Sequence, residues 1–148
     1  MTGVEPLLRI DGLTVAFPAD AAVRALSLTV AAGETVAIVG ESGSGKSMTA
    51  LALMRLLPRS ARIAAGSARF AGRDLMALDE PAMRRVRGRE IAMIFQEPRT
   101  SLNPVHTIGA QIVEVLRLHE GLGRAAARRR AIELLDLEIG RASCRERV

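Results

Sequence analysis

Residues 40–47 have the sequence Gly40-Glu41-Ser42-Gly43-Ser44-Gly45-Lys46-Ser47. A short apolar run rich in β-branched residues, 35–39, precedes them, and a helix-forming segment, 48–57, follows and stops at Pro58. A strand, a glycine-rich loop and a helix in this order are typical of a phosphate-binding loop, because successive backbone N–H groups can turn inward around an anion. The stretch therefore predicts such a P-loop, and the alternative is a Gly/Ser surface loop.

Lys46 is the one lysine of a chain that has 21 Lys and Arg residues together. An ammonium group on a flexible stem is a compact point charge that can reach between the β- and γ-phosphates of a nucleotide. The hydroxyl of the next residue, Ser47, is then placed to ligate Mg²⁺. The loop therefore predicts binding of a nucleoside triphosphate together with its metal ion.

Composition and charge narrow the class of protein. The 148 residues are 49% hydrophobic, which is enough for a buried core in one domain. No run approaches the roughly 18 apolar residues of a membrane-spanning helix, and Glu5, Arg9 and Asp11 lie where a signal peptide needs an apolar segment. The net charge of +5 comes from scattered arginines, and the aromatic residues are three phenylalanines. We therefore expect a cytosolic protein without a nucleic-acid partner.

Periodicity and turn residues predict the secondary structure. Strands are expected at residues 7–10, 13–17, 25–30, 35–39, 67–70 and 90–95, the first three of them paired with one another. A turn is expected at 72–73, and helices at 48–57, 80–87, 108–119 and 124–136. Asp79 and Thr107 are the expected N-caps of the second and third helices, and Pro81 lies in the first turn after Asp79.

A second motif lies at the end of the strand expected at 90–95. It has the sequence Met93-Ile94-Phe95-Gln96-Glu97-Pro98-Arg99-Thr100-Ser101-Leu102-Asn103-Pro104. Together with the P-loop it resembles the ATP-binding subunits of ABC transporters, and within them the dipeptide/oligopeptide/nickel/glutathione importer group. The resemblance covers residues 5–137. It implies an α/β fold: a P-loop NTPase core with a mostly parallel sheet, an antiparallel N-terminal β subdomain, and the start of an α-helical subdomain near residue 98.

The resemblance also implies roles for individual residues. The P-loop, Gly40 to Ser47, would hold the triphosphate of ATP, with Lys46 on its β- and γ-phosphates and Ser47 on Mg²⁺. Gln96 matches the glutamine of the Q-loop, which reaches the metal ion or the attacking water and connects the nucleotide site to the membrane subunits. A neutral amide can do this without adding charge. Phe17 takes the place of the aromatic residue that stacks on adenine, and its alternative role is that of an ordinary core residue.

Partners and location follow from the same resemblance. The chain would bind integral-membrane permease subunits near residues 96–103, pair with a second ATP-binding subunit of the same or another kind, and act indirectly with a solute-binding protein. It would lie peripherally on the cytoplasmic face of the cell membrane. Its function would be to couple ATP binding and hydrolysis to the import of peptides or similar small solutes.

The later motifs of this family do not occur in these 148 residues. They are the Leu-Ser-Gly-Gly-Gln signature, a Walker B strand ending in Asp-Glu, a D-loop and a switch histidine. Leu78-Asp79-Glu80-Pro81 is similar to Walker B, but it precedes Gln96 and no apolar strand leads into it, so we interpret it as a helix cap and first turn. We expect the family's ATPase activity to be missing from this chain alone, which would bind nucleotide weakly without hydrolysing it.

Residues 138–148 are similar to one translated reading frame of a short-read sequencing adapter. We therefore expect the native sequence to agree with this chain only to Leu137. The single cysteine, Cys144, falls in that segment, so it carries no information on the redox compartment.

Two other functions are compatible with the P-loop. The first is a different P-loop enzyme, such as a small-molecule kinase, in which Asp79 would contact a metal ion or substrate. The second is a non-transport ABC protein that acts on nucleic acid or ribosomes, which salt-dependent binding of RNA or DNA would reveal.

Overall fold

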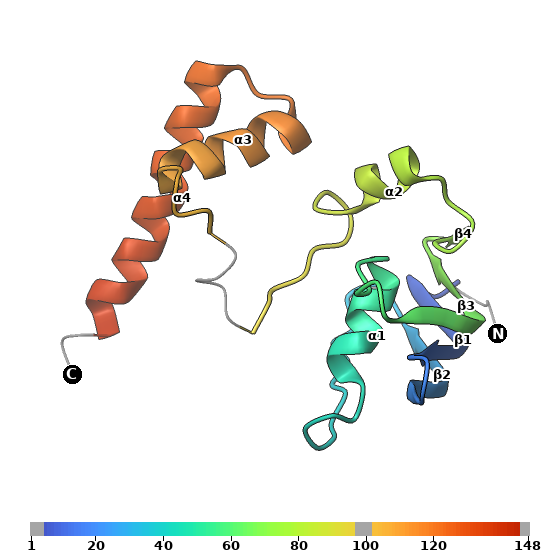
Figure 1. Ribbon diagram of the computed structural model, residues 1–148. Helices are drawn as coiled ribbons and strands as arrows, with labels where there is room; N and C mark the ends of the chain where they lie inside the picture. The colour runs from blue at the N-terminus through green and yellow to red at the C-terminus, as the bar shows by residue number, and fades with distance from the viewer. Residues whose placement is uncertain (1–4, 97–101, 146–148) are drawn as a thin grey trace. The chain divides into compact units, whose positions relative to one another are not determined.

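The computed structural model describes residues 5–96 and 102–145, the side chains of 138–145 excepted. The chain divides into two compact units, Met1–Ile91 and Ala92–Val148, and each is described by itself. In Figure 1 the first unit runs from blue to yellow-green and contains all the strands. Among the described residues, no helix is both long enough and apolar enough to cross a membrane.

The first unit is built on a four-stranded antiparallel sheet. Its strands are β1 (Leu8–Ala16), β2 (Ala21–Val30), β3 (Arg62–Phe70) and β4 (Arg73–Asp74), in the spatial order β2-β1-β3-β4. β1 is the central strand, because it pairs with β2 on one side and with β3 on the other. The predicted antiparallel N-terminal sheet is confirmed, with β2 and β3 each beginning a few residues earlier than the sequence indicated.

A bulge in β1 explains why the sequence suggested two strands there. Ile10, Leu13 and Val15 are all buried, although a regular strand would place residues 10 and 13 on opposite faces. The register with β2 shifts between Ile10 and Leu13, and the freed N–H of Gly12 donates to Ser27 Oγ at 2.9 Å. One extra residue thus returns Leu13 to the core face without ending the strand.

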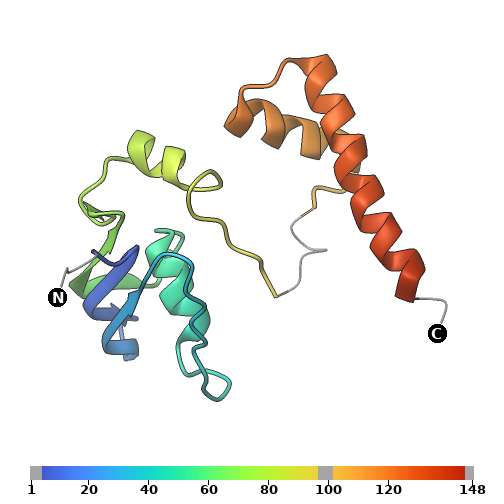
Figure 2. The ribbon, with the colours of Figure 1, turned by 180° about the vertical axis from the view of Figure 1, so that it is seen from behind.

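Two helices complete this unit, α1 (Lys46–Leu53) and α2 (Glu80–Val86). One hydrophobic core joins them to the sheet and consists of Ile10, Leu13, Val15, Val23, Ala52, Ala68, Leu75, Met83 and Val86. Asp79 accepts a hydrogen bond from the N–H of Ala82 at 2.7 Å, and the predicted N-cap of α2 is therefore confirmed. Figure 2 shows α1 beside the sheet from the opposite direction.

α1 is shorter than predicted and ends before Pro58 is reached. Arg55 adopts a left-handed conformation, with φ of 51°. The N–H of Leu56 donates to Leu51 and that of Arg55 to Ala52, at 2.8 and 3.0 Å, which is the Schellman pattern of a helix end. Glycine is the usual residue here, whereas Arg55 takes this conformation with its guanidinium donating to the carbonyl of Leu78 at 2.5 Å.

The two predicted strands on either side of the P-loop helix are not strands in the structure. Residues 34–40 have no regular structure, and Val39 is 92% exposed. In the segment expected at 90–95, only an isolated parallel bridge between Arg87 and Ile91 forms, and Ile94 is 92% exposed. A strand needs a neighbour for its N–H and C=O groups. Within the part of the chain that the structure describes, neither segment pairs with another strand.

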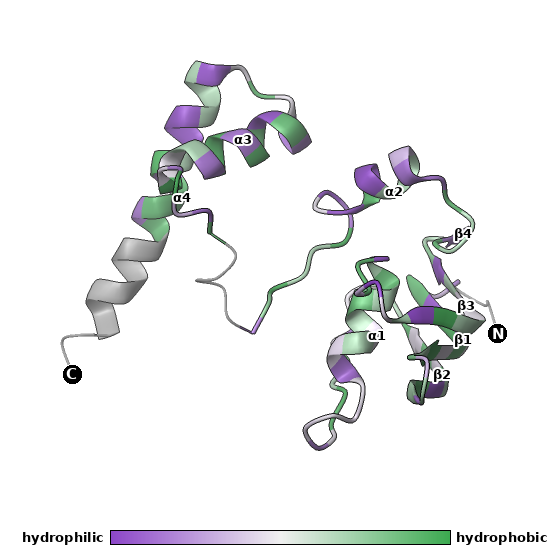
Figure 3. Cartoon of the chain, in the orientation of Figure 1, coloured by the Kyte–Doolittle hydropathy of each residue, from purple (hydrophilic) through white to green (hydrophobic). Residues whose placement is uncertain are grey.

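The second unit consists mainly of two helices that pack on each other, α3 (Ile108–Glu120) and α4 (Arg124–Arg145). Thr107 accepts from the N–H of Ala110 at 3.2 Å, so the predicted cap of α3 is confirmed. Figure 3 shows apolar and polar residues alternating along α3, and its apolar side packs on α4 through Leu116, Ala127 and Ala131. α4 continues past the predicted end at residue 136, as far as Arg145.

Candidate functional site

The predicted P-loop connects β2 to α1. The N–H of Ser44 donates to the carbonyl of Glu41 at 3.2 Å and closes a turn at the tip of the loop. Gly45 is the N-cap of α1 and has a φ of 88°, a left-handed conformation that residues with a Cβ avoid. The loop therefore enters the helix at a sharp angle, and Lys46 and Ser47 become its first two residues.

Gly45 also brings the loop into direct contact with the sheet. A Cβ atom at this position would lie 2.2 Å from the carbonyl oxygen of Ala22 and 3.0 Å from Val23 Cγ2. No side chain fits in that space, so only glycine allows α1 to begin against β2. The sequence marked Gly45 as a phosphate-loop glycine, and the structure adds that it is the packing contact between the loop and β2.

The ammonium group of Lys46 lies at the centre of the loop. Its Nζ donates to the carbonyls of Gly40 and Glu41 at 2.6 and 2.7 Å, and to Ser44 Oγ at 3.0 Å. An ammonium has three N–H donors, and here all three are directed to acceptors of the loop itself. Oxygen atoms of three loop residues thus hold the ammonium group inside the loop.

Thr49 anchors the first turn of α1 and was missed by the sequence analysis. Its hydroxyl donates to the carbonyl of Gly45 at 3.1 Å, and its N–H reaches the same oxygen at 2.9 Å. The side chain is 5% exposed, and it is the buried polar residue of the described core. A threonine four residues after the helix N-cap was the available signal, because Thr hydroxyls commonly bond the i−4 carbonyl.

Phe17 lies beside the P-loop, and its contact with the nucleotide stays a prediction. Together with the loop residues Gly43 and Ser44, it lines an open hollow of about 550 Å³. The other lining residues come from the β1–β2 turn and the start of β2, namely Asp20, Ala21, Ala22 and Arg24. The structure thus brings an aromatic ring and the phosphate loop to one surface, although they are separated in sequence.

Asp20 and Arg24 form an ion pair at this hollow, which the sequence analysis did not single out. Arg24 Nη2 lies 2.5 Å from Asp20 Oδ1, and the N–H of Ala21 donates to the same oxygen at 2.7 Å. These two contacts, the backbone bond first, lower the pKa of the Asp20 carboxyl below its usual value. The sequence signal for this ion pair was the presence of opposite charges at residues 20 and 24, on either side of the start of β2.

Gln96 belongs to the other unit, and its side chain is exposed. Its relation to the P-loop therefore stays a prediction. The Q-loop segment that follows, residues 97–101, lies outside the described residues, as does much of the region 96–103 predicted to contact a permease. Of the predicted site residues, the structure brings together Phe17 and residues 40–47.

The metal-binding predictions rest on few protein ligands. Among residues 5–96 and 102–137, no group of three His, Cys, Asp or Glu side chains is arranged to hold a metal ion. The Ser47 hydroxyl is exposed next to Lys46, which suits Mg²⁺, an ion commonly bound by one or two protein oxygens and the phosphates of its nucleotide. Asp79 is engaged as the cap of α2, so the structure supports its interpretation as a structural residue.

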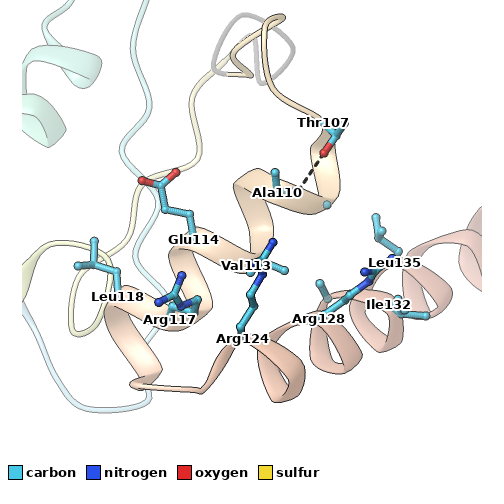
Figure 4. Close-up of a pocket in the computed structure, with 12 residues that line it drawn as sticks. Thr107, Ala110, Val113, Glu114, Arg117, Leu118, Arg124, Arg128, Ile132 and Leu135 are labelled. Carbon is cyan, nitrogen blue, oxygen red and sulfur yellow. Dashed lines mark hydrogen bonds between the residues drawn. The ribbon is translucent and has the colours of Figure 1, made fainter.

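A larger groove, of about 980 Å³, lies in the second unit between α3 and α4 (Figure 4). Its apolar lining includes Val113, Leu118 and Ile132, and Arg124 and Arg128 extend along it from α4. None of the residues predicted to bind nucleotide lines this groove. The candidate nucleotide site is therefore the smaller hollow beside the P-loop.

Comparison with known proteins agrees with the resemblance of the two motifs. The chain is 52% identical, over 153 residues, to a putative peptide import ATP-binding protein of Brucella abortus (strain 2308), covering 97% of this chain and 45% of the relative. A protein of the same description from Brucella ovis is 51% identical over the same length. A peptidoglycan transport ATP-binding protein of Agrobacterium fabrum is 49% identical over 144 residues, covering 94% of this chain and 26% of the relative.

The chain thus spans less than half the length of these curated relatives. The model of the family described as ABC transporter matches residues 23–145, a range that includes the P-loop, Gln96 and both helices of the second unit. The match and the relatives together decide the family, and the chain belongs to the ABC transporter family.

Proposed function

We propose that this chain is the nucleotide-binding part of an ATP-binding subunit of an ABC importer for peptides or similar small solutes. The observation that carries the proposal is the Lys46 ammonium, bonded on three sides inside a loop that shares a hollow with Phe17. The relatives are named for peptide import and peptidoglycan transport, which supports the solute class.

The loop contributes to binding through charge and geometry. Phosphate oxygens of ATP would replace the carbonyls of Gly40 and Glu41 as acceptors for Lys46, and would also bond the loop N–H groups. The face of the Phe17 ring is suited to stacking on adenine. Ser47 would hold Mg²⁺, whose contribution when bound is to neutralise phosphate charge. The resemblance names Gln96 as a further ligand in the complete subunit.

The exposed apolar segments 35–39 and 91–95 support the predicted core of the complete subunit. Val39 and Ile94 are each 92% exposed, although both belong to runs whose composition is typical of buried strands. We infer that, in the complete subunit, these segments are strands of the mostly parallel sheet of the P-loop core. The native residues that follow Leu137 would then supply further strands, and residues 138–148 of this chain would not be native sequence. Sequencing of the source locus across the codon for Leu137 tests both statements.

Partners are proposed for the complete subunit. Permease subunits would contact residues 96–103, where the described residue Leu102 is 45% exposed, and a second ATP-binding subunit would complete the nucleotide site. A solute-binding protein would act through the permease, and the subunit would lie peripherally on the cytoplasmic side of the membrane. The alternative of a small-molecule kinase that uses Asp79 loses its main support, because that carboxylate caps α2.

The test is the equilibrium binding of MgATP by the purified 148-residue chain, measured by calorimetry. We expect weak binding that Lys46→Ala abolishes, while Arg59→Ala, which removes an exposed cation outside the loop, leaves it unchanged. Phosphate release should stay at the level of the buffer, because the chain lacks the Walker B residues. Steady release of phosphate that disappears in Lys46→Ala would contradict this part of the proposal.

A further inference from the structure

We propose that the Asp20–Arg24 pair is the sugar-binding element of this site, with Asp20 Oδ2 accepting hydrogen bonds from the ribose hydroxyls of the nucleotide. The inference rests on the proposed function and adds a specificity residue to it. The resemblance and the relatives' names assign no role to either residue.

The first argument is position. Along the chain, Asp20 lies between Phe17, the proposed base contact, and Ala22, whose carbonyl packs against Gly45 of the P-loop. The N–H of Phe17 donates to the carbonyl of Asp20 at 2.7 Å, so this turn holds the main chains of the two residues together, and both residues line the hollow. In a nucleotide, the sugar lies between base and phosphates. A nucleotide held at both ends would therefore bring its ribose to the part of the hollow that Asp20 lines.

The second argument is the face of β2. Val23 is 7% exposed and belongs to the core, so its neighbours Ala22 and Arg24 face the other way, into the hollow. Both bonds recorded for the Asp20 carboxylate, from Arg24 and from the N–H of Ala21, end on Oδ1. They fix the orientation of the carboxylate and leave Oδ2 to a ligand.

The third argument is chemistry. An ionised carboxylate only accepts hydrogen bonds, and vicinal hydroxyls offer two donors. The bonds from Ala21 and Arg24 lower the pKa of Asp20, so the group stays ionised at neutral pH. Arg24 acts as a positioning residue for this acceptor.

The experiment compares ATP with 2′,3′-dideoxy-ATP on the 148-residue chain and on two variants, again by calorimetry. We expect the wild-type chain to bind ATP about fivefold more tightly than the dideoxy nucleotide, because the dideoxy nucleotide lacks the hydroxyl donors for Asp20. Asp20→Ala should weaken ATP binding by the same factor and leave dideoxy-ATP unchanged. Asp11→Ala is the matched control, because Asp11 also forms an exposed ion pair, with Arg9 at 2.8 Å, but lies away from the hollow.

Equal affinities of the wild-type chain for ATP and dideoxy-ATP would overturn the inference, and this comparison does not depend on the folding of any variant. Equal weakening of both nucleotides by Asp20→Ala, with its circular dichroism unchanged, would overturn it as well. In either case, binding that still needs Lys46 would leave the proposed function standing. Absence of any Lys46-dependent binding would instead overturn the proposed function and this inference together.

Discussion

Arg87 Nε donates to the main-chain carbonyl of Met54 across 2.7 Å, and so connects the residue after α2 to the end of the P-loop helix. The same guanidinium pairs with Glu80 at 2.6 Å, and its side chain is 18% exposed. Arg55, also at the end of α1, donates to Leu78 just before α2. Arg87 and Arg55 thus each donate a side-chain hydrogen bond between the end of α1 and the ends of α2, beside the shared hydrophobic core.

Arg87→Ala should lower the free energy of unfolding of the chain by about 2 kcal/mol, because it leaves the carbonyl of the buried Met54 without its donor. Urea denaturation followed by circular dichroism measures this. Arg84→Ala is the matched control, since Arg84 approaches the same Glu80 only at 3.6 Å and is 77% exposed. We expect the control to change stability by less than about 0.5 kcal/mol. Equal losses in both variants would show that the Met54 contact is not the cause.

Gly45→Ala should damage the loop far more than Gly43→Ala does. Both glycines have positive φ, 88° and 82°, so both alanines pay the left-handed strain of about 1 kcal/mol. Only at Gly45 does the new Cβ meet backbone, the Ala22 carbonyl, whereas nothing lies within 4 Å at Gly43. Thermal unfolding and ATP titration of the two variants test the difference. Similar melting temperatures and affinities would contradict the contact between the loop and β2.

Lys46→Arg should not restore the ATP binding that Lys46→Ala loses. The acceptors Gly40 O, Glu41 O and Ser44 Oγ converge on one Nζ atom at 2.6 to 3.0 Å. A planar guanidinium spreads its donors over a wider fork and cannot take this position. Calorimetric titration of the three proteins with MgATP provides the measurement, and an arginine variant with wild-type affinity would show that charge alone is sufficient.

Asp79→Ala should reduce stability by about 1 kcal/mol through loss of the α2 cap, with no change in ATP affinity. Asp79→Asn, which keeps a capping oxygen, should recover most of the stability. The pair of variants separates a structural from a ligand role. Loss of MgATP binding in the stable Asp79→Asn variant would revive the P-loop enzyme alternative.

Glu80 should give the chain an acid-sensitive contribution to stability. Its hydrogen bond with Arg87 lowers the carboxyl pKa below the ordinary value of 4.5. The contribution is therefore present above pH 4.5 and is lost as the pH falls through the lowered pKa of the folded state. Urea midpoints of the wild type and Glu80→Gln should differ at pH 7 and converge once the pH is below the lowered pKa of the folded state. A difference that persists at the lower pH would assign the effect to packing.

Local signals in the sequence were sufficient to predict elements whose hydrogen bonds join residues that are close in sequence. The caps at Asp79 and Thr107 depend on N–H groups three residues away, and both were predicted correctly. The glycines of residues 40–47 likewise specify a loop whose bonds to Lys46 span only a few residues. Helix ends were less certain: α1 stops at Leu53, and Arg55, a residue without the usual glycine's freedom, takes the left-handed conformation just beyond it.

By itself, the sequence determined the P-loop, the antiparallel strands, the helix caps and the family, because each depends on residue types at fixed short spacing. Only the tertiary structure decided which distant groups meet the loop: Phe17, Asp20 and Arg24 reach it through the β1–β2 turn, and the carbonyl of Ala22 limits residue 45 to glycine. It also decided that 35–39 and 90–95 are not strands here. The physical reason is the same in both cases. A strand edge pairs, and a side chain packs, with residues that are distant in sequence, so the neighbouring residues do not predict the partner.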